Sequence, residues 1–360
     1  MKSIFLKMFV AGVVMAAAVM VSASGRADGS TNGAFDRDGI NDRTEKSNRD
    51  DALFPIRENG KWGYIDSSGN VVIEPQFDDA YEFQEGLARV KNGKMWGYID
   101  KSGKVAIGLQ YDAVGDFSEG LARVRIGDRN NGKWGFIDKM GRMVIEAKYV
   151  DVGNFSDGMT VVKINNKWGY IDKAGKIVIE PQYDLEEDFS EGLARVRIGD
   201  FYTGKWGYID KSGTMVIEPQ FDGEEDFREV LAAVKKNSKW GFIDKSGKIV
   251  IEPQFDRAMN YYDGLAAVEK NEKWGYIDKT GKMVIDAKFD WTWHFSEGLA
   301  VVKTGDVDNG KLGFIDKNGK IVIEAKFDRA SNFRDGLADV VIGEKMGYIN
   351  RSGKIVWMEK

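Results

Sequence analysis

The sequence predicts an all-β protein built from about nine tandem copies of a short antiparallel unit. Three observations support this prediction. The dipeptide Trp-Gly, or a relative of it, recurs at spacings of 34 and 38 residues along the chain. Each copy contains short runs rich in β-branched and aromatic residues, which are too short for helices. Glycine-containing turn sequences separate these runs. The nine copies start at Trp62, Trp96, Trp134, Trp168, Trp206, Trp240, Trp274, Leu312 and Met346.

Each copy is predicted to contain three strands in a β-meander. In the second copy, strand A covers 86–90 and strand B covers 96–100, while strand C is clearest at 177–179 in the fourth copy. Asn92-Gly93 between strands A and B is a strong hairpin signal. Between strands B and C, the side chain of a residue such as Asp210 is expected to accept hydrogen bonds from the turn, and Gly213 to take a positive φ. This turn role explains the recurring Asp better than catalysis does. Proline, as at Pro181, is expected to end strand C.

The pattern of apolar residues predicts how the copies are arranged. Trp and Tyr of strand B point to one face of the sheet and Ile to the other, so each sheet must be covered on both faces by its neighbours. A central Trp168→Ala substitution is therefore expected to cost about 3–5 kcal/mol. The array starts at a strand A and ends at a strand C, so no unit is split between the termini. We therefore expect an open β-solenoid or superhelix, with a closed propeller-like ring as the alternative.

The first residues have the pattern of an export signal. Lys2 and Lys7 precede an uncharged apolar run over 8–21, and small residues end at Ala23. The alternative, a membrane anchor, would need roughly 20 apolar residues. We expect a signal peptide at 1–23, a disordered polar linker at 24–52 and the repeat array at 53–360. The linker contains a fragment, 36–42, similar to part of a calcium-binding loop. The expected location is periplasmic or secreted, with no membrane span after cleavage.

Composition excludes several classes of function. The net charge of −5 gives no basic surface for nucleic acid. The chain has no cysteine, so thiolate sites lack their residues, and a histidine metal cluster or a Ser-His-Asp triad has at most one imidazole to use, His294. Carboxylates stand at repeated positions, whereas an active site should break the repeat. We expect no cofactor, no bound metal and no enzymatic activity, with a two-carboxylate glycan-processing enzyme as a weaker alternative.

The run 239–256, Lys-Trp-Gly-Phe-Ile-Asp-Lys-Ser-Gly-Lys-Ile-Val-Ile-Glu-Pro-Gln-Phe-Asp, resembles the WG-repeat, or KWG, family of bacterial proteins. The resemblance extends over 53–360. It implies an all-β repeat protein that is often exported, and it offers no catalytic residue to transfer. The chain departs from the pattern at Val150, Val230, Leu312 and Met346, where we expect looser packing.

Three places break the repeat. At 291–295, the residues Trp291, Trp293, His294 and Phe295 could form an aromatic platform for a sugar ring or a partner's side chain, or could simply add packing. At 186–188 and 224–226, runs of Glu and Asp could bind a cation or a basic partner, or form a solvated loop. The 38-residue copies insert four residues in the A–B hairpin, at 128–132, 201–204 and 306–310, which should protrude.

These features favour a binding function over a catalytic one. We expect a non-catalytic protein of the bacterial envelope that holds a glycan or cell-wall polymer through aromatic surface positions. The alternative is a scaffold that binds another protein through the same surface.

Overall fold

The computed structural model describes residues 51–199, 203–305 and 310–360. Within these ranges the chain forms antiparallel β-sheets and turns, with no α-helix, which confirms the all-β tandem-repeat prediction. No helix in the same ranges is long and apolar enough to cross a membrane. The expected signal peptide, the calcium-loop fragment at 36–42 and all but the last two residues of the expected linker lie outside the described residues.

Nine sheets, here called blades, follow one another along the chain. The first strand of each predicted meander, strand A, corresponds to β1 (Leu53–Glu58), β5 (Leu87–Asn92), β9 (Leu121–Ile126), β12 (Met159–Ile164), β16 (Leu193–Ile198), β20 (Leu231–Lys236), β24 (Leu265–Lys270), β28 (Leu299–Thr304) and β32 (Leu337–Ile342). Strand B corresponds to β2 (Lys61–Asp66), β6 (Met95–Asp100), β10 (Lys133–Asp138), β13 (Lys167–Asp172), β17 (Lys205–Asp210), β21 (Lys239–Asp244), β25 (Lys273–Ile277), β29 (Lys311–Asp316) and β33 (Lys345–Asn350).

Strand C is longer than predicted. It corresponds to β3 (Val71–Phe77), β7 (Val105–Tyr111), β11 (Met143–Tyr149), β14 (Ile177–Tyr183), β18 (Met215–Phe221), β22 (Ile249–Phe255), β26 (Met283–Phe289), β30 (Ile321–Phe327) and β34 (Ile355–Met358). The expectation that proline ends strand C is wrong, because β14 continues through Pro181 to Tyr183. The strand can continue because the proline lies in a bulge, where the ladder skips from Ile179 to Tyr183 and needs no amide proton.

Seven blades also contain a fourth, innermost strand that the sequence did not predict. These strands are β4 (Asp79–Gln84), β8 (Ala113–Val114), β15 (Leu185–Glu186), β19 (Gly223–Glu224), β23 (Arg257–Tyr262), β27 (Trp291–Thr292) and β31 (Arg329–Ala330). The blades are numbered as blade 1 (β1–β3), blade 2 (β4–β7), blade 3 (β8–β11), blade 4 (β12–β14), blade 5 (β15–β18), blade 6 (β19–β22), blade 7 (β23–β26), blade 8 (β27–β30) and blade 9 (β31–β34). Five of the innermost strands have only two residues, too few to show the alternation by which strands are predicted.

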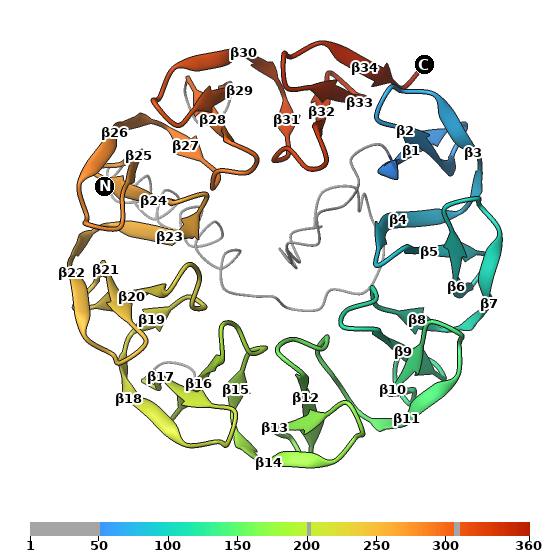
Figure 1. The fold of residues 1–360 in the computed structure, drawn as a ribbon, viewed down its shortest axis with the longest axis horizontal. Helices are drawn as coiled ribbons and strands as arrows, with labels where there is room; N and C mark the ends of the chain where they lie inside the picture. Colours follow the sequence, from blue (N-terminus) through green and yellow to red (C-terminus); the bar gives the residue numbers. More distant parts are fainter. Residues whose placement is uncertain (1–50, 200–202, 306–309) are drawn as a thin grey trace, which may run out of the picture. The chain divides into compact units, whose positions relative to one another are not determined.

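The nine blades form a closed ring, so the expected open solenoid is wrong and the propeller-like alternative is correct (Figure 1). The innermost strands face the axis of the ring and strand C lies at its outer rim (Figure 1). Every blade packs the glycine of its B–C turn against strand C of the preceding blade, for example Gly175 against Ile145. The same contact joins Gly69 of blade 1 to Val356 of blade 9.

Closure does not need a blade shared between the two ends of the array. A cluster of buried side chains joins blade 1 to blade 9, including Phe54, Ile56, Tyr348 and Trp357. The rings of Phe54 and Tyr348 lie 5.5 Å apart, and the Tyr348 hydroxyl donates to the carbonyl of Pro55. Apolar packing of complete blades therefore replaces the exchanged strand whose absence suggested an open array.

The Trp-Gly motif has a physical explanation within each blade. Trp and Tyr of strand B pack toward the next blade, as Trp62 and Tyr64 do against Val90, and Ile99 faces back into the same cluster. The glycine is required by sterics, since a Cβ on Gly63 would lie 2.3 Å from the carbonyl oxygen of Ile73. Strand C crosses directly over this glycine.

The Asp that ends strand B holds the B–C turn, as predicted. In blade 2, Oδ1 of Asp100 accepts hydrogen bonds from the amides of Ser102 and Lys104 at 2.9 and 3.1 Å. Gly103 takes a φ of +82° in the same turn. The turn hydrogen bonds, with Ser102 first, lower the pKa of Asp100. The same arrangement recurs at Asp66, Asp138, Asp172, Asp210, Asp244, Asp278, Asp316 and Asn350.

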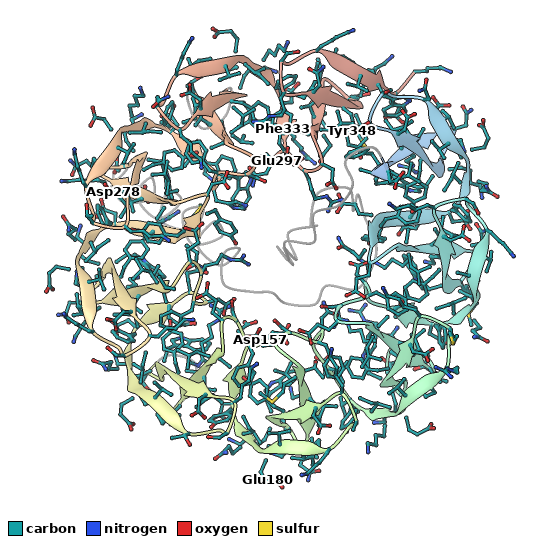
Figure 2. All side chains as sticks on the ribbon, in the orientation of Figure 1. Asp157, Glu180, Asp278, Glu297, Phe333 and Tyr348 are labelled. Atoms are coloured by element: carbon teal, nitrogen blue, oxygen red, sulfur yellow. The ribbon has the colours of Figure 1, made fainter. Side chains whose placement is uncertain are left out.

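Two sets of acidic side chains connect neighbouring blades. On one side, Asp256 pairs with Lys239 of blade 6 and accepts from the amide of Asn271 in the A–B hairpin of blade 7. On the other side, the acid in each turn before strand A accepts from the amide at the equivalent turn of the next blade, at 2.7–3.2 Å. Two of these turn acids, Asp157 and Glu297, lie on the inner side of the ring (Figure 2).

Candidate functional site

Because the blades are copies of one unit, a blade that departs from the common contacts is visible against the others. One recurring contact on the inner wall is made by a serine after the innermost aromatic residue. Ser118, in blade 3, donates its hydroxyl to the carbonyl of Phe155 in blade 4, at 2.7 Å. The serines of blades 4, 5 and 8 make the same bond to the next blade.

A second common contact comes from an arginine at the third position of strand A. Arg89 in blade 2 pairs with Asp116 of blade 3 at 2.8 Å, and Arg195 in blade 5 pairs with Asp226 of blade 6 at 3.1 Å. Arg123 in blade 3 donates to the carbonyl of Val152 in blade 4 at 2.9 Å. These arginines hold the innermost segment of the following blade.

Blades 6, 7 and 9 lack both residues. Arg228, Tyr262 and Arg334 replace the serine, while Ala233, Ala267 and Asp339 replace the arginine. The residue that would face the arginine is no longer acidic in the blades that follow. It is Asn260 in blade 7, His294 in blade 8 and Asn332 in blade 9. The blades that lack both residues therefore lie in one sector of the ring, while blades 2, 4 and 8 each keep one of the two.

The replacing side chains form a continuous stack. The guanidinium of Arg228 lies 4.5 Å from the centre of the Tyr262 ring. That ring stacks on the imidazole of His294, with centres 3.8 Å apart and planes 23° from parallel. Planar groups from blades 6, 7 and 8 are thus in contact across two blade junctions, with a cation–π contact at one end.

Trp291 and Trp293 extend this stack within blade 8. Trp293 lies 6.3 Å from the His294 ring, and the two indoles meet edge to face at 4.8 Å. Both are half-buried and pack against the apolar cluster between blades 8 and 9. We use the name inner-wall site for Arg228, Tyr262, Trp291, Trp293 and His294. Both tryptophans therefore contribute to packing and also keep exposed surface.

The other two predicted residues are buried. Phe295 is 1% exposed and packs against Tyr276 in the core between blades 7 and 8. His294 is 8% exposed, and its Nε2 accepts a hydrogen bond from Nδ2 of Asn332 at 2.9 Å. Burial, followed by the nearby Arg228 charge, lowers the pKa of His294 to about 4. The imidazole is therefore neutral near pH 7. Its face stacks on the Tyr262 ring, and its Nε2 is hydrogen-bonded to Asn332.

The acidic runs surround a half-buried arginine. Arg195 lies within 3.4 Å of carboxylate oxygens of Glu187, Glu224 and Asp226. Glu224 is only 6% exposed, so the run 224–226 is not fully solvated at this residue. Burial raises the pKa of Glu224 to about 8 and that of Glu225 to about 7, because a single guanidinium offsets only part of their charge. No group of three or more possible metal ligands occurs among the described residues.

The inserted hairpins are only partly described. In blade 3, Oδ1 of Asp128 accepts from the amides of Asn130 and Asn131 at 2.8 and 2.9 Å, which closes the insertion as a local turn. Residues 200–202 and 306–309, which include half of the insertion at 201–204 and most of the insertion at 306–310, lie outside the described part of the chain.

Sequence reasoning identified Trp291–Phe295 but missed Arg228, Tyr262, Ala233 and Ala267. A signal for them was present, since lining up the copies shows that serine and arginine are both replaced in blades 6, 7 and 9. Each replacement alone looks ordinary, and only the ring brings Arg228 and Tyr262 into one stack with His294.

The ring is similar to several solved structures at low identity. Kluyveromyces lactis Hsv2 is 11% identical, with 72% of this chain and 91% of that chain covered and a TM-score of 0.39. A form of Hsv2 with one loop replaced gives 11% identity, 78% and 95% coverage and a TM-score of 0.41. A quinoprotein alcohol dehydrogenase-like protein from Bacteroides thetaiotaomicron gives 12% identity, 87% and 76% coverage and a TM-score of 0.33. Likenesses this distant say nothing about what the chain binds.

No curated protein matches the sequence. A family model does match, and it is described as a WG containing repeat. It matches eight times, at 62–96, 96–129, 134–168, 168–202, 206–240, 240–274, 274–307 and 313–345. These matches cover most of the chain and follow the blades one by one. The chain therefore belongs to the family of proteins with WG-containing repeats, as the resemblance of 239–256 implied.

Proposed function

We propose that this protein is a non-catalytic binding protein of the bacterial envelope that holds a glycan on the inner-wall site. The observation that carries the proposal is the stack of planar side chains, Arg228, Tyr262 and His294, at positions where blades 6 to 8 depart from the repeat. A binding site on a repeat scaffold is expected where the copies stop being alike, because the common positions are already used to join blades.

The residue types of the sector suit a sugar. Aromatic rings offer flat apolar surfaces to the C–H faces of a sugar ring, and planar polar groups beside them can bond its hydroxyls. Trp291, Trp293 and Tyr262 keep exposed surface, and Arg228 lies at the end of the stack. These features favour a polyhydroxylated ligand over an apolar one.

A binding role suits the sector better than a catalytic one. His294 is buried, neutral near pH 7 and hydrogen-bonded to Asn332, so it is poorly placed to move protons. The cluster of carboxylates in blades 5 and 6 is also a poor candidate for catalysis, because Glu224 and Asp226 pair with Arg195. The export signal expected at 1–23 would deliver the protein to the compartment where envelope glycans are found.

The test is a calorimetric titration of the purified protein with soluble peptidoglycan fragments and envelope polysaccharides. Saturable binding is expected, and Trp291→Ala/Trp293→Ala should weaken it by tenfold or more, since each stacked aromatic contributes about 1 kcal/mol. Trp291→Phe/Trp293→Phe is the matched control and should keep most of the affinity.

Melting curves of both double variants separate lost contact from lost packing. If the wild-type protein binds no envelope glycan but captures an envelope protein, the scaffold alternative replaces the proposal. Release of sugar products during the titration would instead support the glycan-processing alternative.

A further inference from the structure

The turn before strand A in blade 6 carries a strained residue. Glu229 and Val230 occupy its two central positions with φ of +50° and +72°. The second position is glycine in the other described turns of this kind, at Gly86, Gly120, Gly158, Gly192, Gly264, Gly298 and Gly336, with φ between +79° and +89°. A β-branched residue at positive φ is a backbone outlier, because its Cβ crowds the neighbouring carbonyl.

The strain is not offset by packing of the side chain. Val230 is 56% exposed, and among the described large apolar side chains only Met140 and Val150 are more exposed. The backbone of the turn is otherwise unchanged, since the Val230 amide still donates to the Glu191 carboxylate at 3.1 Å, as glycine does in other blades. The only difference from a glycine turn is therefore an isopropyl group presented to solvent.

The position of this group is informative. Val230 stands two residues after Arg228, whose guanidinium begins the stack over Tyr262 and His294. Outlier backbone conformations that the surrounding structure maintains are concentrated at ligand sites. An exposed apolar side chain in a strained turn next to a polar and aromatic site fits a ligand that carries a small apolar substituent.

We propose that Val230 is a ligand-contact residue that packs against the acetyl methyl of an N-acetylated glycan, at the blade 6 end of the inner-wall site. This inference rests on the proposed glycan-binding function and specifies its ligand class. A sugar ring without substituents presents mainly hydroxyls to a turn of this kind, whereas an acetamido group offers one methyl that matches the exposed isopropyl group.

The experiment compares two soluble probes that share a β-1,4-linked backbone, chitotetraose with acetamido groups and cellotetraose without them. The wild-type protein should bind chitotetraose more tightly. Val230→Gly should weaken chitotetraose binding by about tenfold, the lower end for loss of an apolar contact in a specific site, and leave cellotetraose binding unchanged. The same variant should raise the melting temperature by about 2 °C, because glycine relieves the positive φ.

Gly192→Val is the matched control. Gly192 occupies the same turn position in blade 5, with a φ of +87° and no atom within 4 Å of a Cβ built there. The substitution should lower the melting temperature without changing the affinity for either probe.

The outcomes are distinguishable. If Val230→Gly binds chitotetraose as tightly as the wild-type protein does, Val230 is not a contact residue and the inference fails while glycan binding stands. If the wild-type protein binds neither tetrasaccharide nor any envelope polysaccharide, the proposed function fails and the inference fails with it.

Discussion

The hydroxyl of Tyr348 in the last blade donates to the carbonyl of Pro55 in the first, at 2.9 Å, although the two residues are 293 positions apart. Elsewhere the equivalent tyrosine bonds the innermost segment of the next blade, as Tyr98 does to the carbonyl of Gly115. In the described part of blade 1 the sheet starts at β1, so Tyr348 bonds strand A directly. The junction between blades 9 and 1, here called the seam, thus keeps the tyrosine hydrogen bond but with a different acceptor.

The first prediction concerns this seam. Tyr348→Phe removes the hydroxyl and leaves the buried Pro55 carbonyl without that donor, which should cost about 1 kcal/mol of unfolding free energy. Urea denaturation would measure the change. Hydrogen exchange should show the added opening in blades 1 and 9 rather than throughout the ring. Uniform loss of protection would mean that the seam is no weaker than other junctions.

The second prediction tests the steric origin of the Trp-Gly motif in blade 4. A Cβ on Gly169 would lie 2.5 Å from the carbonyl oxygen of Ile179 and 2.7 Å from the nitrogen of Pro181. Gly169→Ala must therefore displace strand C, and we expect a loss of more than about 4 kcal/mol or failure to fold.

Gly158→Ala in the same blade is the control for that substitution. Gly158 has a φ of +84° and open space around a Cβ, so alanine there should cost only about 1–2 kcal/mol. Equal effects of the two substitutions in thermal melts would contradict the steric explanation.

The third prediction ranks two tryptophans of the repeat. Trp274 is buried in the core between blades 7 and 8, whereas Trp168 is half-buried against the cluster between blades 4 and 5. Trp274→Ala should cost about 3–5 kcal/mol, and Trp168→Ala should cost less because it empties less buried volume. Denaturant unfolding of both variants gives the order. If Trp168→Ala lowers the unfolding free energy more than Trp274→Ala does, the buried fraction of the tryptophan does not determine its contribution to stability.

The fourth prediction is a stability maximum in mildly acidic solution. The pKa values of Asp100, Asp256 and similar turn or bridging aspartates are lowered, so their contribution is present above the unfolded pKa and is lost as pH falls below about 4. Glu224 has the opposite sign. Its folded pKa of about 8 exceeds the unfolded value, so its contribution is complete below about pH 4.5 and is lost as pH rises through 8.

Melting temperature measured from pH 3 to pH 9 tests both limbs. Glu224→Gln cannot ionise, so the decline between pH 5 and pH 8 should become shallower while the acid limb stays as it is. Arg195 keeps Glu187 and Asp226 as partners in this variant, which makes it a mild substitution. An unchanged alkaline limb would show that Glu224 does not titrate in this range.

Much of the fold could be predicted because each repeat is locally consistent. Strand B was placed to within one residue in blade 2, and the Asp100 turn was correctly explained, since both depend on neighbours in sequence. Ring closure could not be predicted in this way. It depends on the packing of Phe54 with Tyr348 and Trp357, and nothing in the spacing of the copies encodes the angle between adjacent blades.

The candidate site was predictable only in part, for a similar reason. Trp291 and Trp293 stand out because two tryptophans interrupt a polar segment. Arg228 and Tyr262 do not stand out, because arginine and tyrosine are ordinary beside a turn. Their significance comes from the contacts that they make across blade junctions to His294.

The acid contacts between blades have a consequence for how such a chain can evolve. Each of the acid contacts described above, such as that of Asp256 with Lys239 and Asn271, involves only adjacent blades. A gene duplication that adds one complete unit in the middle of the array would therefore bring its own partners and leave existing junctions chemically intact. The residues special to closure, Phe54, Tyr348 and Trp357, are confined to the terminal units. The number of repeat units can thus change in evolution without substitutions in the terminal blades, and the diameter of the ring would change with it.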